Sequence, residues 1–337
     1  MKKLLKTREL TSFLFLVALF LLVGVINPSF LKASNIVACF NESVVYIIIS
    51  VGMAFTLFIG EIDVSVGANL GFTATVVSCM LRDGQNWGLA FATGILIGAL
   101  FGLFNGWGVA VMKVPSLIFT LGTNGVMRGM MYVYTGGSWV ENLPAGFKKL
   151  YTNTFVGGVS IFFTVTAIVV AVIYFLLKKT KRGRYFIAVG DNPSGATLVG
   201  IPTTQTKVLA YVICGIFAAL SGIVYSSRIG FVTATSGSGY EMKAVAACVL
   251  GGISLSGGVG SVVGAGIGAV IMASISRLLV FMELGSTYDD TITGIMLITI
   301  VVVDSLMQRN AAEKNRRQRL AARTTGGEMG KGDGAHE

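Results

Sequence analysis

Charged residues are scarce in this sequence. Only 12% of its 337 residues are Asp, Glu, Lys or Arg, whereas 53% are hydrophobic. Soluble domains carry about 25% charged residues, and the mean hydropathy of this chain is +0.76. A soluble core cannot bury that much apolar surface, so the composition predicts an integral membrane protein.

The parts of an active site are also missing. The single histidine, His336, is the penultimate residue, and the four cysteines lack the paired spacing of a disulfide framework or a metal site. The Gly-Lys pair at Gly330 and Lys331 lacks the upstream glycine and the following Ser or Thr of a phosphate-binding loop. We therefore expect no catalytic residues, no metal and no cofactor in this chain.

Prolines are few, and all five lie at the edges of apolar segments or between them. This placement supports the segment boundaries, because proline disfavours a helix interior. An apolar run of about 20 residues is long enough to cross a bilayer as a helix. The sequence predicts an all-α polytopic membrane protein with about ten transmembrane helices: Leu10 to Ile26, Ser43 to Gly60, Ile62 to Met80, Gly88 to Met112, Ser116 to Tyr134, Phe155 to Leu177, Val208 to Ser227, Met242 to Ser256, Val259 to Phe281 and Thr291 to Met307.

The net charge of +10 is concentrated in three short segments. These are the N-terminal tail, residues 178–207 and the C-terminal tail, and basic flanks of this kind mark the cytoplasmic side of a membrane protein rather than a nucleic-acid site. Six predicted membrane crossings separate the first basic segment from the second, and four separate the second from the third. All three segments therefore lie on the same side of the membrane. We predict cytoplasmic N- and C-termini, a transmembrane domain over residues 1–308 and a disordered cytoplasmic tail over residues 309–337.

The first apolar segment follows four basic residues, as the core of a signal peptide does. No small-residue cleavage site closes this segment, so we expect a retained helix.

Two short strings resemble each other in the two halves of the chain. Residues Gly60 to Gly67 and Gly251 to Gly258 both combine glycine with an Ile-x-Val/Leu-Ser pattern. Such an echo favours an internal structural repeat, as in many transporters. A tight helical hairpin would require the same residues, and both interpretations stay open.

Polar side chains within the apolar segments are candidates for a gate or a solute path. We select Asp63, Ser65, Asn105, Thr120 and Asn124. Amides and hydroxyls suit a neutral polyhydroxylated solute because they exchange hydrogen bonds without trapping it. Hydrogen bonding between neighbouring helices is the alternative role for each of them.

The connection between the sixth and seventh apolar segments, about residues 179–207, carries the clearest local signal. Asp191 or Asn192 can cap a short helix, Pro193 fits its first turn, and Gly200 can end it. A short helix between two spans suits the docking of a soluble partner. An ordinary connector would have a similar composition.

These residues carry a family resemblance. Gly190-Asp191-Asn192-Pro193, followed by Gly195 to Ile201, resembles the coupling-helix segment of the permease subunits of ribose-type carbohydrate ABC importers. The strings Ile62 to Gly67, Lys113 to Thr123 and Ala247 to Gly264 are similar to the same family. Glu61 departs from the double glycine that is usual at this point of the family.

Within that family, the strings Tyr134 to Pro144 and Gly239 to Ala244 are most similar to the autoinducer-2 and rhamnose permeases. The resemblance implies a multi-pass protein of the bacterial cytoplasmic (inner) membrane that imports a sugar or sugar-like solute of the ribose, rhamnose or autoinducer-2 class. An ion-coupled secondary carrier and a membrane scaffold or receptor are the alternatives.

The resemblance also implies three protein partners. They are a second permease subunit, identical or paralogous, a cytoplasmic ATPase that binds ATP and Mg, and an extracytoplasmic solute-binding protein. Trp139 and Glu141 are candidates for contact with the binding protein. The residues implied in ATPase coupling are Gly190, Asp191, Asn192, Pro193 and Gly200.

Overall fold

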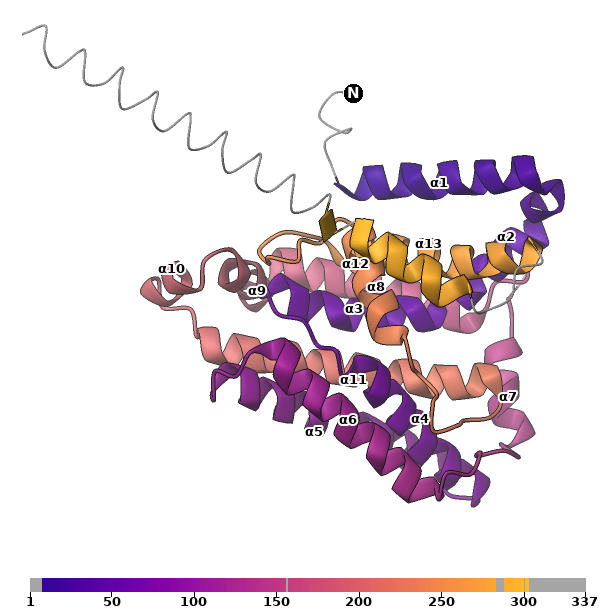
Figure 1. Cartoon of the computed structure of the whole chain (residues 1–337), viewed down its shortest axis with the longest axis horizontal. Coiled ribbons are helices and arrows are strands. Elements are labelled where there is room, and N and C mark those ends of the chain that lie inside the picture. The colour runs from indigo at the N-terminus through magenta and orange to yellow at the C-terminus, as the bar shows by residue number, and fades with distance from the viewer. Residues whose placement is uncertain (1–7, 156, 283–287, 300, 303–337) are drawn as a thin grey trace, which may run out of the picture. The chain divides into compact units, whose positions relative to one another are not determined.

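The computed structural model describes residues 8–155, 157–282, 288–299 and 301–302 (Figure 1). This part of the chain is helical and has no extended strand. Its only β pairing consists of isolated bridges, Val140 with Val232 and Thr154 with Ser160. The all-α prediction is thereby confirmed for the described residues. The tail predicted over residues 309–337 lies outside them.

Each of the ten predicted apolar segments overlaps a helix. The last of them, Thr291 to Met307, overlaps the helical residues 288–299, and its remainder is only partly described. The named helices are α1 (Arg8–Ile26), η2 (Pro28–Leu31), α2 (Ala33–Glu42), α3 (Val44–Phe58), α4 (Val66–Arg82), α5 (Trp87–Ala110), α6 (Ser116–Thr135), α7 (Ala145–Thr152), α8 (Ile161–Lys179), α9 (Lys181–Asp191), α10 (Pro193–Leu198), α11 (Thr203–Ile229), α12 (Tyr240–Leu250) and α13 (Val262–Phe281).

Five of the described helices are long and apolar enough to cross a membrane: α1, α5, α8, α11 and α13. A sixth span is possible if α2 and α3 count together, because they are bent by 42° at a short break. Helix α12, with 11 residues, is shorter than a bilayer requires, and α4, with 17, is at the lower limit. The chain is a multi-pass membrane protein, and the count of ten spans stays a prediction.

Residues 1–294 form one compact unit, and residues 295–337 form another, whose described residues 295–299 and 301–302 are helical. In the first unit, α11 packs along α5, α3 and α4, and Figure 1 shows α5 beside α11.

The contact between α5 and α11 depends on glycine. A Cβ atom on Gly98 would overlap the carbonyl oxygen of Gly215, and one on Gly215 would overlap the carbonyl oxygen of Gly98. A Cβ on Gly102 would similarly overlap the carbonyl oxygen of Tyr211. Small residues at such positions let two helix backbones approach closely inside a membrane.

We expect Gly215→Ala to destabilise the protein by about 1–3 kcal/mol, because the added methyl group must push α5 away from α11. The control is Gly294→Ala in the helical residues 288–299, where an added Cβ has no atom within 4 Å. That change should be neutral or stabilising, since alanine is the better helix former. Thermal unfolding in detergent can be followed with a thiol-reactive dye, because Cys39, Cys79, Cys214 and Cys248 are all buried and free. Equal unfolding temperatures for the two variants would contradict this account of the helix contact.

Candidate functional site

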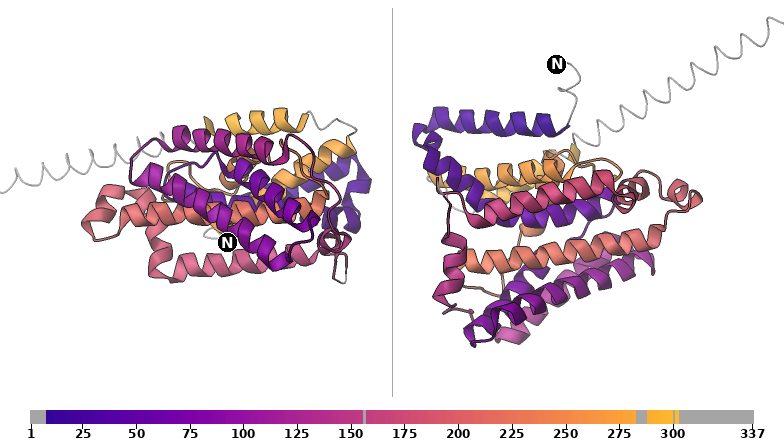
Figure 2. Two further views of the ribbon diagram at one scale, coloured as in Figure 1. Left: turned by 90° about the horizontal axis from the view of Figure 1, so that it is seen from below. Right: turned by 180° about the vertical axis from the view of Figure 1, so that it is seen from behind.

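Loops gather at two opposite ends of residues 1–294. Helices α9 and α10 lie at one end, which we call the α9–α10 end, and α7 lies at the other, the α7 end (Figures 1 and 2). The end of α3 at Phe58 and the loop 251–261 that follows α12 both contact α9, and Gly60 after α3 contacts the same loop at Gly257. The predicted coupling residues and the predicted binding-protein contacts therefore lie at different ends.

Helix α10 is the short helix that the sequence predicts between two spans. Its cap is Asn192, whose side-chain oxygen accepts a hydrogen bond from the Gly195 amide at 2.8 Å. Pro193 occupies the first turn, and Gly200 leaves the helix with a φ of +80°. Of the two residues proposed as caps, Asn192 has this role, and Asp191 is the last residue of α9.

The end of α10 exposes two large apolar side chains. Leu198 is 89% exposed and Val199 is 76% exposed. α10 packs against α9 and α11, and Ala196 is its buried residue. Leu198 and Val199 are therefore candidates for contact with a partner or with the membrane surface. The exposure of these two residues could not be predicted from the sequence, because a six-residue helix is too short to show a hydrophobic periodicity.

Gly190, next to the end of α9, brings three segments into backbone contact. A Cβ atom on Gly190 would overlap the carbonyl oxygen of Phe58 and lie 2.5 Å from the Gly258 nitrogen. The same Phe58 oxygen accepts a hydrogen bond from the Gly258 amide at 3.0 Å. Gly257 lies against the backbone of both Gly60 and Gly190. We call these five residues the glycine junction.

The two strings that resemble each other in sequence build the same kind of helix end. Gly60 after α3 and Gly252 after α12 have φ values of +76° and +85°. The amides of the next residues, Glu61 and Ile253, bond back to carbonyl groups five residues earlier. This is the Schellman cap, which requires the left-handed conformation that glycine adopts freely. The cap glycine is the first residue of one string and the second of the other, so the two helix ends share a cap type but not the register of the echo, and an internal repeat stays a prediction.

Glu61 occupies the place of the second glycine that is usual in the resembling family. Its φ is negative, since Lys113 and Asn142 are the only non-glycine residues with positive φ in the described part of the chain. A side chain is therefore allowed at position 61. The Glu61 carboxylate accepts a hydrogen bond from Lys207 at 2.5 Å. This ion pair connects loop 59–65 to the first turns of α11, which directly follows α10.

Three of the five gate or pathway candidates form one buried cluster. Asp63 is 2% exposed, and one of its carboxylate oxygens accepts hydrogen bonds from the Ser65 amide at 2.9 Å and the Ser65 hydroxyl at 2.6 Å. The Asn105 amide group donates to the Ser65 hydroxyl at 2.8 Å and lies 3.4 Å from both Asp63 oxygens. The buried side-chain oxygen of Asn105 has no partner among the described residues.

The other two candidates hold the same loop from α6. The Thr120 hydroxyl accepts a hydrogen bond from the Val64 amide at 3.1 Å, and the Asn124 side chain donates to the Val64 carbonyl at 2.9 Å. The structure thus brings all five candidates together around loop 59–65. In this arrangement Thr120 and Asn124 bind the backbone of the loop, and Asn105 is the candidate whose fully buried side-chain oxygen has no partner among the described residues.

The α7 end presents an exposed aromatic pair. Trp139 stacks on Phe231 with ring centroids 5.6 Å apart and an interplanar angle of 10°. The neighbouring residues Val140 and Val232 exchange two backbone hydrogen bonds. Glu141 is exposed beside them. Sequence analysis selected Trp139 and Glu141 but missed Phe231, because nothing local to residue 231 shows that it pairs with a loop about 90 positions earlier.

Charges within the apolar helices have partners in the structure. Lys243 pairs with Asp289 at 2.6 Å, Arg277 pairs with Glu42, and the Arg128 side chain donates to a backbone carbonyl. In the described residues, no group of three His, Cys, Asp or Glu side chains is arranged to hold a metal ion. These charges therefore act between helices in this structure.

We expect Asp63→Asn to destabilise the protein by about 1–3 kcal/mol, because the amide would turn a donor toward the Ser65 and Asn105 donors and leave polar groups unpaired. The control is Asp83→Asn, an exposed carboxylate whose side chain pairs with that of the neighbouring Arg82 at 2.9 Å. The same dye assay measures both. An unchanged unfolding temperature for Asp63→Asn would show that this cluster does not hold loop 59–65.

Comparison with known proteins gives the family. The family model for the branched-chain amino acid transport system / permease component matches residues 35–301. The autoinducer 2 import system permease protein LsrC of Escherichia coli O9:H4 (strain HS) is 40% identical over 94% of this chain and 92% of its own length. The LsrC proteins of Enterobacter sp. (strain 638) and Salmonella typhi are 39% and 38% identical, over 98% and 94% of this chain and 96% and 90% of their own lengths. No solved structure matches the chain.

These relatives confirm the resemblance to the autoinducer-2 branch of importer permeases. The matched residues include α3 to α13 and with them both ends described above. The chain therefore belongs to the family of transport-system permease components, and it is a multi-pass membrane permease.

Proposed function

We propose that this chain is the membrane-spanning permease subunit of an ABC importer for a sugar-like solute in the bacterial cytoplasmic membrane. The observation that carries the proposal is the α9–α10 end, where an exposed apolar helix end is joined through Gly190 to the ends of two other helices. Relatives that match nearly the whole chain are permeases of autoinducer 2 import systems. The solute class we propose is accordingly that of autoinducer-2, with ribose and rhamnose as related candidates.

In this proposal the α9–α10 end faces the cytoplasm, and a separate ATPase docks on Leu198 and Val199. That partner binds ATP and Mg, and this chain has no catalytic role. Movement of α9 on ATP binding is passed at Gly190 to Phe58 and to Gly258. The contacts join backbone to backbone, so the loops after α3 and α12 follow α9 rather than absorbing its movement in flexible side chains.

Loop 59–65 is the proposed gate. Asp63 and Ser65 lie in this loop and hydrogen-bond to Asn105 on α5, so a shift of the loop changes the cluster that they form. The unused side-chain oxygen of Asn105 can accept a hydrogen bond from a solute hydroxyl. The ion pair of Glu61 with Lys207 connects the same loop to the segment after α10. The proposed ATPase-docking surface on α10 and the proposed gate in loop 59–65 are thus connected through the contacts of Gly190 and through the Glu61–Lys207 ion pair.

A second permease subunit, identical or paralogous, is proposed to pack on α6. Ile118, Gly122, Gly125, Gly129 and Val133 lie on one face of this helix and are exposed. A Cβ atom on any of the three glycines would have no atom within 4 Å. An exposed face with a small-xxx-small pair is typical of helix association in membranes.

At the α7 end, the proposed partner is the extracytoplasmic solute-binding protein. Trp139 and Phe231 form an exposed stacked pair held by backbone bonds between their loops, and Glu141 adds a negative charge beside it. Exposed, rigid aromatic side chains are common anchors of protein interfaces.

The two ends provide a matched pair of variants. We expect Leu198→Asp to abolish association with the ATPase in a pull-down from membranes and to leave capture by the solute-loaded binding protein unchanged. Trp139→Asp should have the opposite effect, because it changes only the α7 end. Both variants should insert in the membrane at wild-type levels, since both side chains are exposed.

Normal ATPase association of the Leu198→Asp variant would remove α10 from the coupling surface. Solute uptake into liposomes on an ion gradient, by this permease without an ATPase, would contradict the importer proposal itself. That result would favour the ion-coupled carrier.

A further inference from the structure

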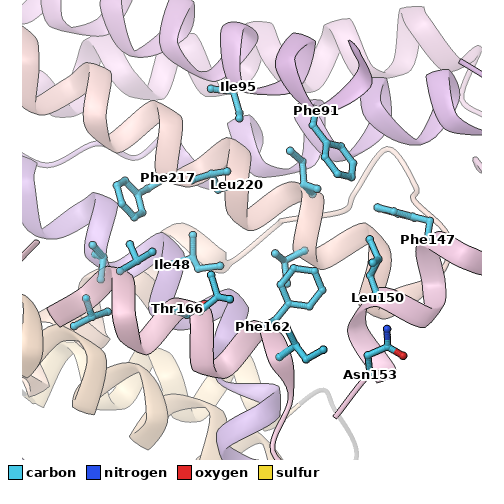
Figure 3. A pocket seen from close by; sticks show the side chains of 17 residues that line it. Ile48, Phe91, Ile95, Phe147, Leu150, Asn153, Phe162, Thr166, Phe217 and Leu220 are labelled. Carbon is cyan, nitrogen blue, oxygen red and sulfur yellow. The ribbon is translucent and has the colours of Figure 1, made fainter. Parts of the chain in front are cut away.

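A long apolar groove runs along α8. Its first part is a cavity of about 420 Å³ between α8, α11 and α5, lined by Phe162, Phe217 and Leu220 among others (Figure 3). Its second part is a cavity of about 460 Å³ along the later half of α8. Val169 and Phe217 line both cavities, so the two parts adjoin each other. We call them the α8 groove.

The α8 groove opens onto the outer surface of the helices. Ile168, Val172 and Leu176 line it and are exposed large apolar residues of α8. The opposite wall consists of aromatic and aliphatic side chains such as Phe55 and Ile213. In a bilayer, an apolar groove of this kind faces hydrocarbon chains.

The dimensions of the second cavity match one leaflet. The residues of α8 that line this cavity run from Ile168 to Leu177, a rise of about 14 Å at 1.5 Å per residue. The hydrocarbon core of a bilayer is about 30 Å thick, so one leaflet is about half of that. An acyl chain lying along α8 would therefore reach from the membrane midplane to the end of the helix.

The groove ends at a cluster of positive charge. Arg182 lines it directly, and Lys179, Lys181 and Arg184 are exposed nearby in the sequence. None of these four residues forms an ion pair with another described residue. Basic pockets at the membrane surface between helices are typical sites for anionic lipid headgroups.

We propose that the α8 groove binds an anionic phospholipid of the cytoplasmic leaflet, with one acyl chain along Val172 and Leu176 and the phosphate group at Arg182. The leaflet assignment rests on the orientation in the proposed function. Phe186 of α9 also lines the groove and contacts Phe55 of α3, with ring centroids 5.1 Å apart. The lipid would thus contact α9, the helix that carries Gly190, and its presence would adjust the position of the glycine junction.

The test uses the purified full-length permease in nanodiscs, with phosphatidylglycerol or phosphatidylcholine that carries a nitroxide near the end of one acyl chain. We expect an immobilised component in the electron paramagnetic resonance spectrum, stronger for phosphatidylglycerol. Arg182→Gln should reduce the preference for phosphatidylglycerol about fivefold, the effect of one basic residue near an anionic surface. Val172→Trp should fill the groove and remove the excess of the immobilised component for phosphatidylglycerol over phosphatidylcholine.

Two matched controls are available. Phe175→Trp changes an exposed residue of α8 that does not line the groove, and it should leave the spectrum unchanged. Lys179→Gln removes a neighbouring charge that does not line the groove, and its effect should be smaller than that of Arg182→Gln.

Equal binding of both lipids by the wild type, or an unchanged spectrum for Val172→Trp, would overturn the proposal. A change from dimer to monomer on Val172→Trp, without a change in lipid binding, would show that the groove is a protein interface and would also overturn it. The measurement needs neither ATPase nor solute. A failed transport assay with normal lipid binding would therefore contradict the proposed function and leave this inference intact.

Discussion

At Gly190, the backbone of α9 lies directly against the end of α3 and the loop after α12, with no space for a side chain. Gly257 and Gly258 complete this contact, with φ values of +84° and +72° that glycine adopts without strain. Packed backbone transmits displacement, because it has no rotamers in which movement can be lost. In the proposed mechanism this contact connects α9 to loop 59–65, the proposed gate. The close glycine contact of α5 with α11 holds these two helices together beside it.

The helices were predictable because a bilayer imposes long apolar segments, and each predicted segment overlaps a helix. The lengths were less predictable. Helix α12 has 11 residues and α4 has 17, since both adjoin the two glycine loops and their ends are fixed by contacts between distant segments. The break between α2 and α3 lies at Ser43, the first residue of a predicted apolar segment, whereas the ten-residue helix α2 before it was not predicted.

In the candidate site, too, the features set by adjacent residues were predictable from the sequence, and the features set by contacts between distant segments were not. Asn192, Pro193 and Gly200 were predictable because helix capping depends on adjacent residues. Asp63 and Asn105 could be selected because they are polar residues in apolar segments. That they form one cluster results from the packing of α5 against the loop after α3 and could not be predicted locally. Exposure and pairing across the chain, as at Leu198 and Phe231, depend on the assembled fold and have no local sequence signature.

The most direct test of the account is Gly190→Ala in the complete importer, reconstituted in liposomes with its ATPase and solute-loaded binding protein. The added methyl group would separate α9 from Phe58 and Gly258 and leave the exposed docking residues of α10 unchanged. We expect the variant to bind the ATPase normally, while ATP-driven uptake and the stimulation of ATP hydrolysis by loaded binding protein fall about tenfold or more, the effect of about 1.4 kcal/mol. Wild-type uptake and stimulation by an assembled Gly190→Ala importer would contradict the central claim that the glycine junction couples the ATPase to the gate.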